Sequence, residues 1–453
     1  MEARENKMGT MPIGKLLATM SGPAILSMLI NSLYNIVDSI FVAQIGEKAL
    51  TAVSIVFPIQ ALLVAMGVGT GVGLNSLISR RLGARRFQDA DDAASCGIKL
   101  GVLNWLVFAI FGLFFSEAFM KIFSTDQTVI QYGVDYMQII TIFSVFTMTA
   151  MICEKIFQAT GNMIVPMITL IVGAVTNIIL DPILIFGWFG LPEMGVSGAA
   201  AATVIAQSIG CALGIFILIK KDHAVNVRVF SKDFKLRTIK DIYAVGAPSI
   251  VMQALGSVML FGMNAILASF SGTAVAVLGV YGKLQSFVFM PAIGVNQGAL
   301  PIMGYNYGAK NRERMMRCFK LAIIAAMSIM ALGLLLFQFF PGLLLSMFNA
   351  SDNMYTIGID ALRSISWCFI PAGFGIVAAG LFQATGHGMM SMWGSMIRQF
   401  VGILPLALIF GKLFGLRMVW FAFPLAEIIG VAYYIIVLKY IYNKTFKNLG
   451  VEE

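Results

Sequence analysis

The sequence Phe-Gln-Ala-Thr-Gly occupies residues 157–161 and occurs again at residues 382–386, which is 225 positions later. Three further matches keep nearly the same spacing: Pro23 with Pro248, Gly83-Ala84 with Gly308-Ala309, and Leu-Ile-Phe-Gly at 184–187 with 408–411. A five-residue identity at a fixed offset, supported by the other matches, is unlikely to arise by chance. We therefore expect two equivalent halves.

The composition excludes an ordinary soluble enzyme. Of the 453 residues, 59% are hydrophobic and 12% are charged, whereas about 25% are charged in a typical soluble domain. The mean hydropathy is +0.87. A soluble protein of this size would have too little polar surface to cover its core, so we expect a polytopic membrane protein.

Twelve apolar segments are long enough to span a bilayer, which requires about 20 residues each. They lie near residues 14–41, 49–78, 93–116, 130–157, 164–187, 196–219, 241–269, 275–303, 317–340, 355–382, 390–411 and 416–442. Six spans per half is an even number, so both halves insert the same way up, related by a pseudo-two-fold axis along the membrane normal. The expected fold is all-α, with an N-lobe at 1–219, a cytoplasmic linker at 220–240 and a C-lobe at 241–453.

Lysine and arginine gather in alternate loops, which predicts the orientation. They are frequent before span 1, after spans 2, 6 and 8, and near the C-terminus, whereas the other loops contain only Lys48, Lys121, Lys412 and Arg417. Basic loops stay in the cytoplasm. We therefore expect a multi-pass protein of the cell membrane with both termini cytoplasmic. The net charge of +9 then reflects topology and does not indicate nucleic acid binding.

A polar stripe runs along span 1. Asn31, Tyr34, Asn35 and Asp38 are spaced i, i+3, i+4 and i+7, so they share one helical face. Such a face must meet a cavity or another helix, because lipid cannot satisfy it. An ion or substrate site is one interpretation, and a hydrogen-bonded seam between helices is the other.

Span 5 contributes Asn177 and Asp181, one turn apart, followed by Pro182. Proline lacks an N–H and frees the carbonyl four residues before it. An acid, an amide and a free carbonyl together suit ion coupling, although Asp181 could instead only compensate the proline. At 1.5 Å per residue, Asp38 and Asp181 both lie in the outer half of the N-lobe. We expect Asp38, Asp181, Asn177 and Tyr34 to form the coupling site, and sodium could bind Asp38, Asp181 and Asn177.

Glu154 lies near the cytoplasmic end of span 4, away from the two aspartates. An acid at the cytoplasmic mouth could meet a cationic substrate, and the adjacent Lys155 makes a plain ion pair the alternative. With Asn31 and Asn35, Glu154 is a candidate substrate-binding residue.

Other features predict packing. Gly67, Gly69, Gly71 and Gly73 superficially resemble a phosphate-binding loop, but they lie within a span without a following Lys-Ser/Thr, so close helix packing or a hinge is expected. In the C-lobe the offset replaces the two aspartates by Met263 and Leu406, so coupling chemistry is expected in the N-lobe alone. Asp360 and Arg363 are spaced to pair, whereas Arg398 and Glu427 have no evident place. No cofactor and no metal cluster are expected.

The sequence resembles the multidrug and toxic compound extrusion (MATE) family, and within it the DinF-like branch with its MepA-type members. The resemblance rests on Asn-Ser-Leu-Tyr-Asn-Ile-Val-Asp at 31–38, Gln-Ala-Thr-Gly at 158–161 and 383–386, and Leu-Asp-Pro-Ile-Leu-Ile-Phe-Gly at 180–187. It implies two six-helix lobes and antiport of drugs against protons or sodium. It also implies that Asp38, Asp181, Asn177 and Tyr34 are the coupling residues, and that Glu154 stands where MepA-type members carry an acid. NorM-like members have coupling acids in the C-lobe, including span 7, and residues 242–269 contain none.

The expected function is secondary active export of lipophilic organic cations, with protons favoured over sodium as the coupling ion. Aromatic faces and carboxylates together favour such cations. The main rival is a flippase for lipid-linked precursors, which would need a basic cavity. A membrane enzyme is not expected, because no nucleophile–base pair or phosphate loop supports one. The partners expected are the bilayer, organic cations, and protons or sodium, with the chain a monomer.

Overall fold

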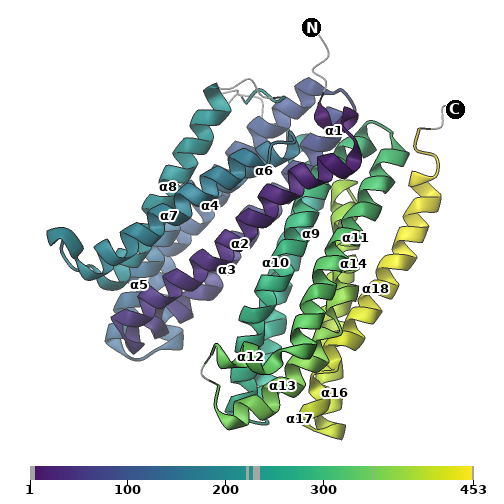
Figure 1. Ribbon diagram of the computed structural model, residues 1–453. Helices are drawn as coiled ribbons and strands as arrows, with labels where there is room; N and C mark the ends of the chain where they lie inside the picture. The colour runs from purple at the N-terminus through teal and green to yellow at the C-terminus, as the bar shows by residue number, and fades with distance from the viewer. Residues whose placement is uncertain (1–5, 221–223, 228–234, 349, 451–453) are drawn as a thin grey trace. The chain divides into compact units, whose positions relative to one another are not determined.

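The computed structural model describes residues 6–220, 224–227, 235–348 and 350–450. Within this part of the chain, ten helices are long and apolar enough to cross a membrane, and two bent helix pairs raise the number of spans to twelve (Figure 1). The predicted all-helical, polytopic fold is therefore confirmed. The linker expected at 220–240 includes residues 221–223 and 228–234, which lie outside the described residues.

The spans of the two halves follow the same order, and some of them also have the same length. The first half contains α1 (Lys7–Thr10), α2 (Ile13–Ile45), α3 (Glu47–Gly83), α4 (Phe87–Phe123), α5 (Gln127–Ile142), α6 (Ser144–Ala159), α7 (Ile164–Phe186), η1 (Trp188–Gly190) and α8 (Gly195–Lys220). The second contains α9 (Leu236–Ala268), α10 (Gly272–Gly308), α11 (Arg312–Phe339), α12 (Pro341–Ser346), α13 (Asp352–Ser366), α14 (Phe369–Ala384), α15 (Gly388–Met396), η2 (Ile397–Ile403), α16 (Leu404–Phe414), α17 (Leu416–Val419), α18 (Ala422–Ile441) and η3 (Tyr442–Phe446). Both α3 and α10 have 37 residues and begin 225 positions apart, at 47 and 272.

One span of each half is bent. The helices α5 and α6 meet at 44°, and their counterparts α13 and α14 meet at 48°. Pro371, in the first turn of α14, lacks the N–H that would continue the preceding helix. At the α5–α6 break, Ser144 Oγ donates to the Thr141 carbonyl at 2.7 Å, so a side chain competes for the backbone there. Hydropathy alone does not reveal either bend.

The chain divides into two compact units, and two helices contribute to both. Unit 1 is Leu29–Ile250 with the N-terminal residues up to Asn6, and unit 2 is Lys7–Met28 with Val251–Glu453. The beginning of α2 therefore belongs to unit 2, and the beginning of α9 belongs to unit 1. A division of the chain at the linker alone would place the beginning of α2 in the first half and the beginning of α9 in the second.

Four glycines on alternate positions of α3 let it pack tightly within unit 1. A Cβ atom at Gly69 would lie 2.4 Å from Ile250 Cγ1, and one at Gly73 would lie 2.1 Å from the Ile242 carbonyl oxygen, both on α9. Gly67 and Gly71 face α6 instead, where a Cβ would lie 2.4 Å from Met151 Sδ and 2.5 Å from Lys155 Cγ. The expectation of close helix packing is confirmed.

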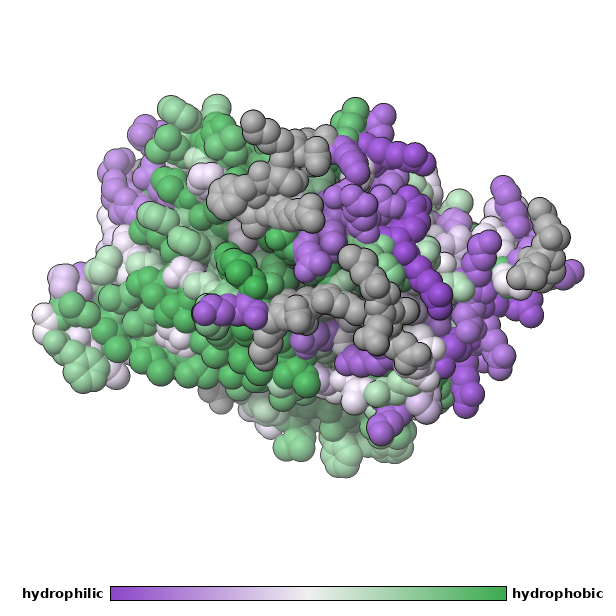
Figure 2. Space-filling model, turned by 90° about the horizontal axis from the view of Figure 1, so that it is seen from above, coloured by the Kyte–Doolittle hydropathy of each residue, from purple (hydrophilic) through white to green (hydrophobic). Residues whose placement is uncertain are grey.

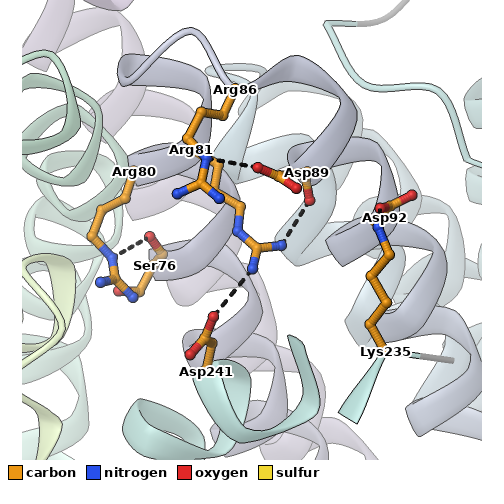
Figure 3. A network of polar contacts seen from close by, with 8 residues as sticks. All are labelled: Ser76, Arg80, Arg81, Arg86, Asp89, Asp92, Lys235 and Asp241. Atoms are coloured by element: carbon orange, nitrogen blue, oxygen red, sulfur yellow. Dashed lines mark hydrogen bonds and ion pairs between the residues drawn. The ribbon is translucent and has the colours of Figure 1, made fainter. Parts of the chain in front are cut away.

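Polar contacts hold the beginning of α9 on unit 1 (Figure 3). Arg81, at the end of α3, donates to Asp241 Oδ2 on α9 at 3.2 Å and to the Asp89 carbonyl on α4 at 2.7 Å. Just before α9, Lys235 Nζ lies 2.6 Å from Asp92 Oδ2. Arg81 is nearly buried, so its charge requires these partners.

The proposed pairing of Asp360 with Arg363 is wrong. Asp360 Oδ2 instead pairs with Arg417 Nε at 3.2 Å, and Arg363 Nε donates to the Gln338 carbonyl. The i, i+3 spacing permits a pair, but α17 brings a second arginine close to Asp360.

Hydrophobic side chains cover the outside of the spans, as lipid requires. Phe114, Phe261 and Leu332 are among the large apolar side chains that are mostly exposed. Hydrophilic residues gather instead on part of the face seen in Figure 2. The surface is thus that of a multi-pass membrane protein.

We expect Gly73→Ala to destabilise the protein by about 1–3 kcal/mol, because the added methyl group would overlap the α9 backbone. Gly256→Ala, with no atom within 4 Å of the new Cβ, is the matched control and should be neutral or stabilising by up to about 1 kcal/mol. The five cysteines are free and buried, so the temperature at which they become reactive to a thiol dye reports unfolding. Equal transition temperatures for the two variants would contradict the packing argument.

Candidate functional site

A cavity of about 170 Å³ opens within unit 1, between α2, α6, α7 and α8. Its polar lining is formed by Asn31, Tyr34, Thr147, Glu154, Thr169, Asn177, Thr203 and Gln207. Its apolar lining includes Met151 and Leu170. Cavities that are mainly apolar with a few polar groups are the usual binding sites for small molecules.

Small residues on α7 and α8 create this space. Gly173 and Ala174 on α7 face Ala206 and Gly210 on α8, and all four line the cavity. A Cβ at Gly210 would lie 3.2 Å from the Thr169 carbonyl oxygen, so the two helix backbones nearly touch there. Without large side chains at these positions, the space beside the seam stays open.

At one end of the cavity, Asn177 and Asp181 form a buried polar cluster. Asn177 Nδ2 donates to Asp181 Oδ1 at 3.3 Å and to Thr203 Oγ1 at 3.4 Å. Within the described residues, Asp181 Oδ2 and Asn177 Oδ1 are buried without a hydrogen-bond partner. Two unpaired oxygens in a low-dielectric site are costly, and a proton or a small cation would satisfy them.

Asp38 and Tyr34 of α2 complete this cluster. Asp38 is near enough to Asp181 for their charges to interact, and Tyr34 lies in the field of both acids. Tyr34 lines the cavity together with Thr203. The structure therefore brings together the four residues that the sequence suggested for ion coupling, from spans 1 and 5.

The polar stripe of α2 has more than one environment. Asn31 and Tyr34 line the cavity, whereas Asn35 is exposed and donates its amide to the Asn31 carbonyl at 2.8 Å. Asp38 is only partly buried and is not among the lining residues. A shared helical face thus predicts the side of α2 on which these residues lie. It does not predict which of their side chains reach the cavity.

Glu154 lines the cavity and also forms the ion pair considered for it. Its Oε1 accepts hydrogen bonds from Gln158 Nε2 at 2.6 Å and from Lys155 Nζ at 3.2 Å. Lys155 Nζ donates to Gln158 Oε1 as well, at 3.0 Å. The two interpretations of Glu154 are therefore compatible, because its carboxylate is oriented by the pair and still borders the cavity.

The cavity connects Glu154 with the acid cluster. Along α7 it extends from Pro166 to Asn177, a rise of about 16 Å at 1.5 Å per residue. Asp181 follows one turn beyond Asn177. A molecule in the cavity would therefore have a carboxylate near one end and the buried cluster at the other.

The sequence did not single out Thr147, Thr203, Gln207 or Tyr136. Thr147 Oγ1 hydrogen-bonds to Gln207 Oε1 across the α6–α8 interface. Tyr136, on α5, is buried and lies in the field of Asp38, Tyr34 and Asp181. Threonine, glutamine and tyrosine in apolar spans are common, so only their position beside the acids distinguishes them.

Comparisons of the sequence with known proteins agree on one family. A sequence model described as MatE matches residues 23–183 and 248–409. The multidrug export protein MepA of Staphylococcus haemolyticus is 27% identical over 416 residues, covering 92% of this chain and 91% of the relative. MepA of Staphylococcus aureus (strain MRSA252) is 26% identical over 418 residues, with the same coverage.

Solved structures show the same fold. A multidrug resistance MATE family transporter of the MOP superfamily, in an outward-facing conformation, has a TM-score of 0.90 at 24% identity, over 97% of this chain and 98% of that one. A MATE structure in a bent conformation has a TM-score of 0.88 at 25% identity, over 96% and 97% of the two chains. The family model spans matching parts of both halves of the chain, so the repeated helices and the cavity described above are those of a member of the MATE family.

Proposed function

We propose that this protein exports lipophilic organic cations by antiport against protons, with sodium as the alternative coupling ion. The observation that carries the proposal is the single cavity that joins Glu154 to the buried Asn177–Asp181 cluster. The MepA relatives, which are multidrug export proteins by name, support export of drugs.

The cavity lining favours a cation over an anion. Glu154 is the one Asp, Glu, Lys or Arg residue among the lining residues described. Met151 and Leu170 give it apolar walls, and Tyr34 adds an aromatic ring, which attracts cations. A flippase for pyrophosphate-linked lipids would require basic groups here, so the lining supports the cation exporter.

The acid cluster provides the coupling site. When Asp38 and Asp181 are both ionised they repel each other in a poorly hydrated site. A proton taken up from one side of the membrane would relieve that repulsion, and its release to the other side would restore the negative charge. The unpaired oxygens of Asn177 and Asp181 would also suit sodium, which is the alternative.

Coupling follows because the cluster and the cavity share residues. Asn177 and Tyr34 line the cavity; Asn177 also donates to Asp181, and Tyr34 lies in the field of both acids. Loading the cluster with a proton weakens attraction for a cation in the cavity and permits α2 to repack. Binding of drug and of proton thereby oppose each other, as antiport requires.

We expect Asp38→Asn and Asp181→Asn each to reduce drug efflux driven by a pH gradient by at least about tenfold, equivalent to about 1.4 kcal/mol of coupling. Neutral asparagine keeps the volume but cannot exchange a proton. Efflux of ethidium from proteoliposomes under an imposed pH gradient measures this, with Asp360→Asn as the matched control. If Asp38→Asn or Asp181→Asn keeps the efflux rate of the wild type, the replaced aspartate is structural. If the wild-type protein exports drug under a sodium gradient alone, sodium is the coupling ion.

Glu154→Gln should weaken tetraphenylphosphonium binding about three- to tenfold, or about 0.7–1.4 kcal/mol, and should spare a neutral ligand of similar size. The substitution removes the charge while an amide can still bond to Gln158. Equilibrium dialysis with both ligands measures the difference. Equal loss for both ligands would leave Glu154 only its structural ion pair with Lys155.

The proposal places both chain termini and the 220–240 segment in the cytoplasm, on the charge imbalance of the loops. A cysteine introduced at position 232 should resist a membrane-impermeant maleimide added to intact cells and should react after permeabilisation. Labelling of that cysteine from outside would reverse the orientation and with it the direction assigned to transport.

A further inference from the structure

The internal repeat allows each residue that lines the cavity in unit 1 to be compared with its counterpart in unit 2. The offset is 225 up to the pair 161 and 386, and 224 from the pair 184 and 408 onward. Among the counterparts are Gly375 for Ala150, Ser395 for Leu170, Arg398 for Gly173 or Ala174, Glu427 for Thr203, and Tyr434 for Gly210. Small residues of unit 1 thus correspond to three large polar residues of unit 2.

Two of these large residues form an ion pair across the equivalent seam. Arg398 is the second residue of η2, and its Nη1 donates to Glu427 Oε2 on α18 at 3.1 Å. Glu427 is only 5% exposed, and Arg398 Nε is buried without a hydrogen-bond partner in the described part of the chain. The Arg398 side chain is 30% exposed, so the buried partner is Glu427, whose charge would remain uncompensated if the pair separated.

Tyr434 occupies the rest of the space. Its hydroxyl donates to the Ser391 carbonyl at 3.2 Å. A Cβ at Gly394 would lie 2.3 Å from Tyr434 Cε1, and one at Gly375 would lie 3.3 Å from Glu427 Oε1. In unit 1, by contrast, a Cβ at Gly173 would meet only a backbone oxygen, that of Ala206 at 3.6 Å.

We propose that Arg398, Glu427 and Tyr434 form a plug that fills, in unit 2, the place of the drug cavity in unit 1. The plug restricts organic cations to one site per chain and so keeps the bound drug beside the acid cluster. The side chains exclude the ligand because they occupy the volume, while the charges of Arg398 and Glu427 offset each other. That the excluded ligand is an organic cation rests on the proposed function. That side chains fill this space in unit 2 does not depend on it.

Thiol reactivity tests the plug without any ligand. Leu170→Cys and Ser395→Cys place a thiol at equivalent positions of the two units, and the buried native cysteines set the background. N-ethylmaleimide should modify Leu170→Cys at least about tenfold faster than Ser395→Cys. Adding Tyr434→Gly to Ser395→Cys should remove most of that difference. If Ser395→Cys alone reacts as fast as Leu170→Cys, unit 2 is open and the plug does not exist.

Binding stoichiometry tests the consequence. The variant Arg398→Gly/Glu427→Thr/Tyr434→Gly copies the unit 1 residues into unit 2 and should bind two tetraphenylphosphonium ions per chain, against one for the wild type. The matched control Arg398→Met/Glu427→Gln removes the charges but keeps the volume, and should still bind one. A folded triple variant that binds one ion would overturn the proposal, as would a control that binds two, since volume would then not exclude the ligand.

The two proposals fail in different ways. If the triple variant does not fold, the comparison of Ser395→Cys with and without Tyr434→Gly still decides whether the plug exists. Tetraphenylphosphonium should slow modification of Leu170→Cys in the wild-type background. Absence of that protection would count against the proposed drug site alone, because the difference in reactivity between the two thiols involves no ligand.

Discussion

The close approach of helix backbones along α3 is the constraint on which the site depends. In a bilayer the hydrophobic effect does not drive helices together, so small residues that allow tight van der Waals contact do. Gly67 and Gly71 set the distance from α3 to α6, and the stem of Lys155 lies against Gly71. That contact holds Lys155 where its ammonium reaches Glu154 and Gln158. The wall of the cavity that carries Glu154 is thus positioned by glycines that do not line the cavity.

The duplicated scaffold is used in two ways. The bent span and the long second helix recur in both halves with nearly constant spacing. The seam between the last two spans differs, because glycine and alanine in unit 1 are replaced by Arg398 and Tyr434 in unit 2. Duplication preserves the order of the spans, while the π-helix η2 and the larger side chains at a few seam positions set unit 2 apart from the continuous α7 of unit 1.

Sequence patterns predicted the spans, the repeat and the residues of the acid cluster, for different physical reasons. Lipid imposes length and apolarity on every span, and a buried aspartate such as Asp181 is too costly to be incidental. The patterns could not predict that Thr203 would meet Asn177, since a threonine on the alanine-rich α8 carries no distinguishing signal. Nor could they reveal that Asn35 would be exposed while Asn31 lines the cavity, because a helical face covers a wide arc. The use of Arg398 and Glu427 as a pair required the tertiary contact between η2 and α18.

The division of α2 and α9 between the two units affects how the chain can be made. Residues 7–28 leave the ribosome first, yet the glycines against which they pack, Gly294 and Gly298, are synthesised more than 260 residues later. Such non-local contacts slow folding. Unit 1 likewise remains incomplete until residues 236–250 have emerged. The first six spans therefore wait in the membrane with an uncovered glycine face on α3, and insertion of α9 is the step at which the first half acquires its final packing.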